Sequence, residues 1–99
     1  MRSDTVVVDV QLPGVLREHA GGQDVVRLEL ADDATVAGAL AALARQWPAL
    51  GRRLRDDTGA VRRHVNLFVD GDDVRSLDRA GTALHDGAVL HVLPSVAGG

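Results

Sequence analysis

The residues with the clearest capacity for chemistry are the last two of the sequence, Gly98 and Gly99. Terminal glycines add little to folding, because glycine has the largest backbone entropy and no side chain to bury. Two residues without Cβ atoms can, however, thread a narrow tunnel, and Gly99 would then present an unhindered carboxylate to the active site of a partner protein. The sequence therefore predicts that this carboxylate is itself a reactive group. The alternative is a frayed end without a function, since glycine is frequent here, with 11 among 99 residues.

A proline stands between this dipeptide and an apolar run, residues 88–93, that is typical of a strand. Proline has no amide hydrogen and a fixed φ, so we expect Pro94 to end the strand pairing and to direct the following residues outward as an extended arm. Val96 in this arm either fills a pocket of a partner or is solvated. We expect residues 1–93 to form one domain and residues 94–99 to form a flexible tail that threads into a partner's active site. The tail consists of Pro94, Ser95, Val96, Ala97, Gly98 and Gly99.

The composition limits the classes of protein that remain. A chain of 99 residues is typical of one domain, and 45% hydrophobic residues can supply its core. No apolar stretch resembles a signal peptide or approaches the ~20 residues of a membrane-spanning helix, and the lack of cysteine excludes disulfides and thiolate metal sites. A cytoplasmic protein without a membrane partner is expected. The net charge of −3 argues against a nucleic-acid partner.

All 11 basic residues are arginine, and lysine is absent. No side-chain amine of this chain can therefore accept an isopeptide bond from another copy, which excludes lysine-linked homopolymers. Five arginines concentrate around the connection between the predicted helix and the next strand: Arg52, Arg53, Arg55, Arg62 and Arg63. This cluster is either a solvated loop balanced by Asp56 and Asp57 or a surface that steers the chain electrostatically toward an acidic partner.

Several strands are predicted from the alternation of apolar and polar residues, which has the period of a half-buried strand. The predicted strands cover residues 5–12, 24–30, 65–69 and 88–93. The dipeptide Asp70-Gly71 is a strong turn signal after the third of them. Beyond this turn, we expect Val74 and Leu77 to belong to a short fourth strand or an extended piece.

The period changes to that of a helix after Thr35, which is the expected N-cap. Pro48 is expected to end this helix. Gly38 lowers the helix propensity by about 1 kcal/mol and is interpreted as a site of close packing. Leu50 and Leu54 predict a second short helical turn. The apolar stripe of the main helix consists of Val36, Leu40, Leu43 and Trp47.

Three stretches resemble the MoaD/ThiS family of prokaryotic sulfur carriers, and most closely its cysteine-biosynthesis branch. They read GGQ at residues 21–23, HVNLFVDGDDVR at residues 64–75, and TALHDG at residues 82–87 with LPSVAGG at residues 93–99. The resemblance spans nearly the whole chain. It implies an α+β fold of the β-grasp, or ubiquitin-like, type, with a mixed sheet of four to five strands and one main helix packed on one face.

The resemblance also implies that the chain is a carrier and not an enzyme. An E1-like, MoeB-like adenylating enzyme with a sulfurtransferase function would adenylate the Gly99 carboxylate with ATP, and a sulfur donor would then convert it to a thiocarboxylate. In the cysteine branch, this sulfur would attack an aminoacrylate on the pyridoxal phosphate of a cysteine synthase, and a metallopeptidase would release the product. The chain itself would bind no cofactor, because ATP, pyridoxal phosphate and any metal belong to the partners.

Other functions remain open at this point. The chain could be the small subunit of molybdopterin synthase, a carrier for thiamine or a thio-containing secondary metabolite, or one carrier shared among several enzymes. A second class is a ubiquitin-like protein modifier conjugated through Gly99 to lysines of other proteins. A third class is a β-grasp binding module without any chemistry at the tail.

Alternation also predicts a surface for docking partners. If Val65 and Leu67 face the helix, Phe68 faces the opposite side of the sheet. The same reasoning places His91 and Leu93 of the last strand on that side. If the third and last strands are neighbours, as the β-grasp fold implies, Phe68, His91 and Leu93 form an apolar patch near the root of the tail. This patch either docks a partner or is covered by the chain itself.

No metal site is predicted. The four histidines, His19, His64, His85 and His91, lack the spacing of a ligand set. Residues 70–73 superficially resemble a calcium loop but lack the other ligand positions and the distal glutamate, so they are interpreted as a turn.

Overall fold

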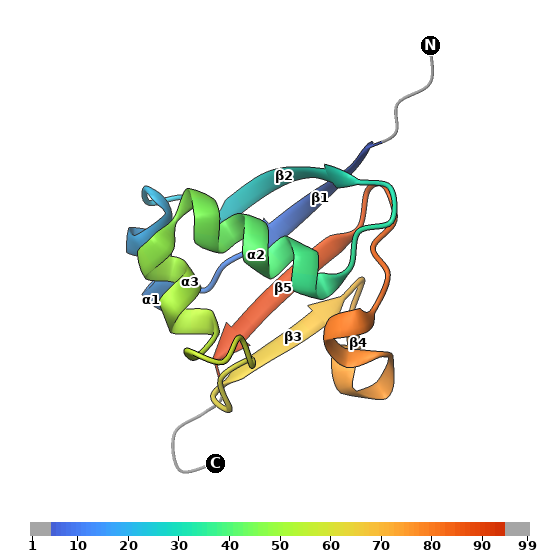
Figure 1. Cartoon of the computed structure of the whole chain (residues 1–99). Helices are drawn as coiled ribbons and strands as arrows, with labels where there is room; N and C mark the ends of the chain where they lie inside the picture. The colour runs from blue at the N-terminus through green and yellow to red at the C-terminus, as the bar shows by residue number, and fades with distance from the viewer. Residues whose placement is uncertain (1–4, 95–99) are drawn as a thin grey trace.

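The computed structural model describes residues 5–94, which form a five-stranded mixed sheet in the order β2-β1-β5-β3-β4 (Figure 1). The strands are β1 (Thr5–Gln11), β2 (Val25–Ala31), β3 (Val65–Val69), β4 (Asp72–Asp73) and β5 (Val89–Pro94). The α-helices are α1 (Gly14–Arg17), α2 (Val36–Gln46) and α3 (Pro48–Leu54), and the 3-10 helices are η1 (Glu18–Ala20), η2 (Val74–Ser76) and η3 (Arg79–Gly81). The α+β class and the mixed sheet are confirmed.

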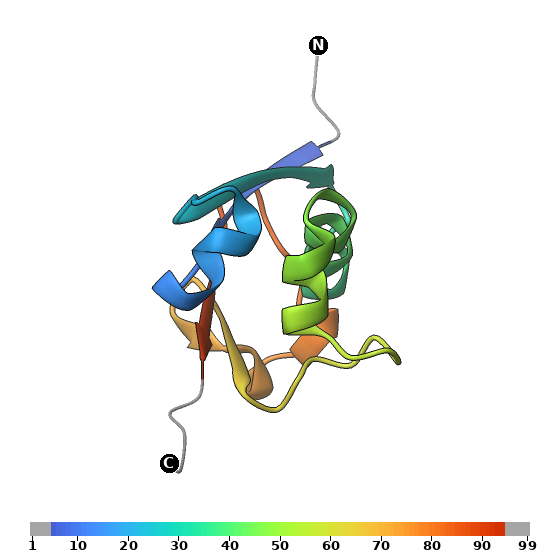
Figure 2. The ribbon, with the colours of Figure 1, turned by 90° about the vertical axis from the view of Figure 1, so that its left-hand side faces the viewer.

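The sheet is assembled around its last strand. β5 pairs in parallel with β1 and antiparallel with β3, while β2 and β4 pair antiparallel with β1 and β3 at the two edges. The alternation predicted from the sequence holds: Val8 and Val10 of β1, like Leu90 and Val92 of β5, are completely buried. These side chains form the core with α2 and α3, which stand together on one side of the strands (Figure 2).

The main helix begins and ends where the sequence predicts. The Thr35 side chain caps α2 by accepting a hydrogen bond from the Gly38 backbone N–H at 3.3 Å, and the helix ends at Gln46, before Trp47 and Pro48. The expectation of one main helix is incomplete, however. Pro48 is the first residue of α3, because a proline at the first helical position gives up no hydrogen bond and has a suitable φ. The predicted short turn at Leu50 and Leu54 is thus a complete helix that buries both leucines.

The expected strand at Val74 and Leu77 is wrong. β4 consists of only Asp72 and Asp73, and a 3-10 turn follows at once. The Asp73 carboxylate caps this turn, since its Oδ1 accepts a hydrogen bond from the Arg75 backbone N–H at 2.8 Å. Val74 is consequently buried while Leu77 is 42% exposed, so the two residues do not share a strand face.

The tightest helix contact lies at Gly51 and not at Gly38. A Cβ atom on Gly51 would lie 2.5 Å from the Cβ of Ala44, whereas one on Gly38 would meet only the Thr35 Oγ1 at 3.8 Å. The approach of α3 to α2 therefore depends on a glycine in α3, and the interpretation of Gly38 as a packing site is wrong. No helix within residues 5–94 combines the length and apolar character that crossing a membrane requires.

A hydrogen-bonded pair fastens the start of β5 to the β3–β4 turn. Asp70 and Gly71 both have positive φ, 51° and 91°, as in the tight hairpin turn that their types predict. The Asp70 carboxylate accepts a hydrogen bond from the Val89 N–H through Oδ1 and lies 2.6 Å from His85 Nε2 through Oδ2. His85 Nδ1 lies 2.8 Å from the Asp86 carbonyl oxygen. Because both ring nitrogens face acceptors, the contact favours the doubly protonated imidazolium.

The first prediction concerns the helix contact. We expect Gly51→Ala to lower the free energy of unfolding by about 1–3 kcal/mol, because the added methyl group must displace Ala44. Gly38→Ala is the matched control and should raise the free energy of unfolding by up to about 1 kcal/mol, because it removes a helix-interior glycine from open space. Urea unfolding of both variants measures these changes, and equal effects would contradict the packing argument.

The second prediction concerns pH. Hydrogen bonding to Asp70, then to the Asp86 carbonyl, and the charge of Asp70 raise the pKa of His85 above its ordinary value of 6.5. A raised folded-state pKa adds stability that is complete below pH 6.5 and is lost as the pH rises through the folded-state pKa. The difference in Tm between the unaltered chain and His85→Ala should therefore be larger at mildly acidic pH than at alkaline pH. In an Asp70→Asn background this pH dependence should shrink; if it persists, another group is responsible.

Candidate functional site

The structure places the root of the tail at the end of the central strand. Pro94 is the last residue of β5 and pairs with Val65, so the strand continues one residue past the boundary expected at residue 93. Ser95, Val96, Ala97, Gly98 and Gly99 lie outside the described residues. Pro94 thus belongs to the sheet, and the assignment of residues 95–99 as a threading tail stays a prediction.

Strand β5 has neighbours on both sides at residues 90–91, and its β3 neighbour continues to Pro94. Leu90 of β5 lies opposite Val10 of β1 and also opposite Val69 of β3. Leu90 and Val92 are fully buried, so sliding β5 along the sheet would move apolar side chains out of the core. Any group that follows Pro94 therefore leaves from a fixed point on a rigid body.

The structure brings the predicted patch together. Phe68 pairs in register with His91, and Leu93 lies opposite Asn66 on the same pair of strands. Phe68, His91 and Leu93 are half-buried and lie on the sheet face opposite the core, with Leu93 next to Pro94 at the strand end. Their placement on one face is confirmed. Their role in docking stays a prediction.

The arginine cluster lies at the same end of the molecule. Arg52 and Arg53 belong to the last turn of α3, and the Arg62 Nε–H donates a hydrogen bond to the Arg52 carbonyl oxygen at 2.8 Å. Asp56 does not neutralise the cluster through an ion pair. Its Oδ1 instead accepts hydrogen bonds from the backbone N–H groups of Thr58 and Ala60, and the Thr58 contacts contribute most to lowering the Asp56 pKa. Within residues 5–94, no ion pair shorter than 4 Å joins Asp56 or Asp57 to an arginine.

The fold brings three further residues, His19, Arg75 and Arg79, to the arginine cluster, and the sequence pattern did not predict them. His19 of η1 lines a hollow with Arg52 and Arg53, while Arg75 and Arg79 line a neighbouring hollow with Arg63. They come from segments far from residues 52–63 in sequence, and no spacing rule connects them. Among the described residues, no three His, Cys, Asp or Glu side chains gather in a way that could hold a metal ion.

The comparison with protein families identifies the chain. The model of the ThiS family matches residues 10–99, which include the described sheet except for the first five residues of β1 and also include the terminal glycine pair. The chain belongs to the ThiS family. The resemblance predicted from the three sequence stretches is thereby confirmed.

Two relatives of this ThiS-family chain carry different names. The sulfur carrier protein CysO of Mycobacterium tuberculosis is 36% identical over 94 residues, covering 93% of this chain and 98% of CysO. The small archaeal modifier protein 3 of Haloferax volcanii is 42% identical over 78 residues, covering 79% of this chain and 84% of the modifier.

Solved structures agree with the described fold. The crystal structure of M. tuberculosis CysO has a TM-score of 0.79 at 34% identity and covers 90% of this chain and 99% of its own. The matching chain of the Amycolatopsis orientalis BexX/CysO complex has a TM-score of 0.79 at 33% identity, covering 93% of this chain and 99% of its own. The β-grasp, ubiquitin-like fold is therefore confirmed. Family members are small sulfur carriers or ubiquitin-like proteins, so the chain is not itself an enzyme.

Proposed function

We propose that this ThiS-family chain is a sulfur carrier whose Gly99 carboxylate is adenylated and then converted to a thiocarboxylate. The observation that carries the proposal is the family match, which runs through residue 99 and so includes both terminal glycines. The fixed position of Pro94 supports it, because a rigid body with an anchored root can deliver five following residues to a partner's active site.

The chemistry requires activation because a carboxylate is a poor electrophile. A carboxylate oxygen of Gly99 would attack the α-phosphorus of ATP, which forms the acyl-adenylate and releases pyrophosphate. A sulfur donor would then attack the acyl carbon and expel AMP, leaving sulfur in place of one carboxylate oxygen. The product is an anionic sulfur nucleophile held covalently, so that free sulfide need not diffuse between enzymes.

The catalytic groups belong to partner proteins in this proposal. An E1-like, MoeB-like adenylating enzyme with a sulfurtransferase function supplies the ATP site, and the chain itself holds no cofactor. The half-buried patch of Phe68, His91 and Leu93 lies beside the root of the tail, where a protein that encloses the tail would contact it. The complex of a CysO with BexX in A. orientalis supports a protein partner in general.

Among the possible acceptors of the sulfur, we favour an enzyme of cysteine biosynthesis. The support for this choice is the 36% identity to CysO across almost the full length of both chains. In this branch the acceptor is a cysteine synthase that carries pyridoxal phosphate, and a metallopeptidase releases the product. Delivery to molybdopterin, thiamine or a thio-containing secondary metabolite remains the alternative, and one carrier could serve several acceptors.

The 42% identity to a small archaeal modifier protein favours a second candidate, a ubiquitin-like modifier conjugated through Gly99. The absence of lysine excludes lysine-linked chains of this protein but permits single attachments to other proteins. A ladder of covalent adducts on denaturing gels of cell extract would favour the modifier. Free thiocarboxylate without such adducts would favour the carrier.

The third prediction tests the carrier chemistry directly. After incubation with the adenylating enzyme, ATP and a sulfur source, intact-protein mass spectrometry should show replacement of one terminal oxygen by sulfur. A variant with one residue added after Gly99 should remain unmodified, because the reactive acid is then misplaced. Deletion of Gly98 and Gly99 should likewise abolish modification, and sulfur delivery at full rate by the deletion variant would overturn the proposal.

The fourth prediction concerns the patch. Phe68→Asp should leave the fold intact and weaken binding to the adenylating enzyme roughly tenfold, because a charge replaces a side chain that the partner would bury. Val25→Asp is the matched control, since Val25 is 38% exposed on the edge strand β2 and the substitution changes the charge equally. Calorimetric titration measures both affinities. Unchanged activation kinetics in a folded Phe68→Asp variant would remove the patch from the docking surface.

A further inference from the structure

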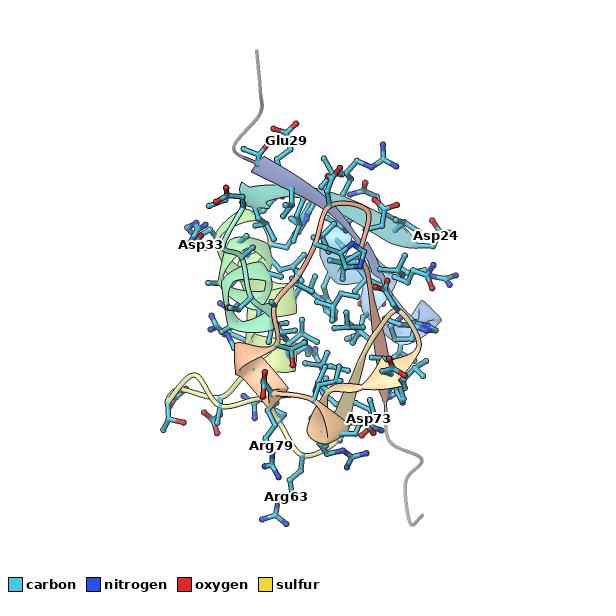
Figure 3. All side chains as sticks on the ribbon, turned by 90° about the vertical axis from the view of Figure 1, so that its right-hand side faces the viewer. Asp24, Glu29, Asp33, Arg63, Asp73 and Arg79 are labelled. Atoms are coloured by element: carbon cyan, nitrogen blue, oxygen red, sulfur yellow. The ribbon has the colours of Figure 1, made fainter. Side chains whose placement is uncertain are left out.

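Charge is distributed unevenly over this molecule. Figure 3 shows Glu29 and Asp33 toward one end, and Arg63 and Arg79 projecting from the other end, where the labelled acidic residue, Asp73, is paired with Arg75. The net charge of −3 therefore conceals a basic region around the root of the tail. An uneven distribution of this kind orients a protein in the field of a charged partner.

The basic region contains two hollows that share one arginine. The first, of about 420 Å³, is lined by His19, Ala49, Arg52, Arg53, Arg62 and His64. The second, of about 440 Å³, has an apolar floor that includes Val65 and Leu67 and a rim that carries Arg62, Arg63, Arg75 and Arg79. Arg62 lies between them. We call the exposed guanidinium groups of Arg52, Arg53, Arg63 and Arg79, together with Arg62, the arginine surface.

Three arginines of the arginine surface have no ion-pair partner within the described part of the chain. Arg62 differs from them, because its charge adds to the Thr58 hydrogen bonds that lower the pKa of the Asp56 carboxyl. Arg75 is paired, because its Nη2 lies 2.7 Å from Asp73 Oδ2, and these contacts lower the Asp73 pKa to about 2. By contrast, no ion pair within residues 5–94 reaches Arg53, Arg63 or Arg79. Unpaired like charges repel one another, so an acidic surface placed against them gains attraction without breaking an existing ion pair.

The backbone conformation of Arg79 supplies an independent indication that the arginine surface is functional. Arg79 has a φ of 53°, in the left-handed region that side-chain-bearing residues seldom adopt. Backbone strain of this kind clusters at functional sites. Here it accompanies an arginine that projects beside Arg63 (Figure 3).

The position of the arginine surface beside the end of β5 indicates which kind of protein would bind it. Five residues follow Pro94, and a chain extends at most ~3.6 Å per residue, so Gly99 lies within about 18 Å of the end of β5. Any enzyme that encloses Gly99 must therefore cover this end of the molecule. We propose that the arginine surface docks an acidic surface around the active-site entrance of the adenylating enzyme, with an aliphatic side chain of that enzyme in the apolar-floored hollow. This inference rests on the proposed function.

A protein fits the surface better than a nucleic acid does. A nucleic-acid backbone would contact the arginines but would leave the apolar floor at Val65 and Leu67 unfilled. The acidic side chains elsewhere on this chain would also repel a polyanion that extends beyond the surface. Acidic residues interspersed with aliphatic ones match both the rim and the floor.

The fifth prediction uses charge reversal at each hollow. Arg53→Glu and Arg63→Glu should each weaken binding to the adenylating enzyme about fivefold at about 0.05 M salt, and the loss should shrink at about 0.5 M salt, where screening is stronger. Arg45→Glu is the matched control, because Arg45 is also exposed in the last turn of a helix and lines neither hollow. It should bind like the unaltered chain. Calorimetric titration without ATP measures docking separately from chemistry, and ATP–pyrophosphate exchange should show a raised KM with an unchanged kcat.

The outcomes separate the inference from the proposed function. Equal affinities for Arg53→Glu, Arg63→Glu and Arg45→Glu would overturn the inference even if Gly99 is adenylated normally. So would failure of the unaltered chain to bind, or salt-sensitive binding of a single-stranded oligonucleotide that is tighter than binding of the enzyme. Arginine-dependent docking without any acyl-adenylate would instead refute the carrier chemistry and leave the inference standing.

Discussion

The pairing of β5 between β1 and β3 is the constraint on which the rest of this structure depends. β1 and β5 are separated by most of the chain, and their parallel pairing cannot form until the intervening segment is folded back across them. Once formed, it encloses Leu90 and Val92 completely. The β3 side of this pairing continues to Pro94, so the strand that closes the core also fixes the point from which the following residues leave.

This arrangement separates mechanical from chemical roles. The body contributes an aliphatic core, a half-buried patch on one sheet face and a basic end, and none of these groups reacts in the proposed mechanism. The reactive group is a backbone carboxylate on residues too small to obstruct an active site. A carrier of this kind can pass between enzymes because its recognition surfaces remain outside the catalytic centre while only the tail enters it.

Some details of the fold were wrong in the sequence analysis for identifiable reasons. The Asp73 side chain competes for backbone N–H groups and converts an expected strand at Val74 into a turn. Close packing occurs at Gly51 because that residue faces Ala44 across two helices, and a helix-interior position such as Gly38 does not by itself reveal what lies opposite. Hydrophobic period does not reveal a competing local hydrogen bond such as that of Asp73, and helix propensity does not reveal which residue of another helix lies opposite a glycine.

The sequence by itself determined the order of the main strands and of the main helix, as well as the N-cap of that helix at Thr35. It also determined which strand faces are buried, and that Phe68, His91 and Leu93 share one face. These follow from local periods and local hydrogen bonds, which operate within a few residues. It also carried the family resemblance, through its terminal glycines and the stretch at residues 64–75. Only the tertiary structure decided that His19 and Arg79 join the arginines of residues 52–63 around the root of the tail. These residues come close together only because η1, α3 and η3 pack around the sheet. Since these segments are distant in sequence, no local sequence pattern predicts their proximity.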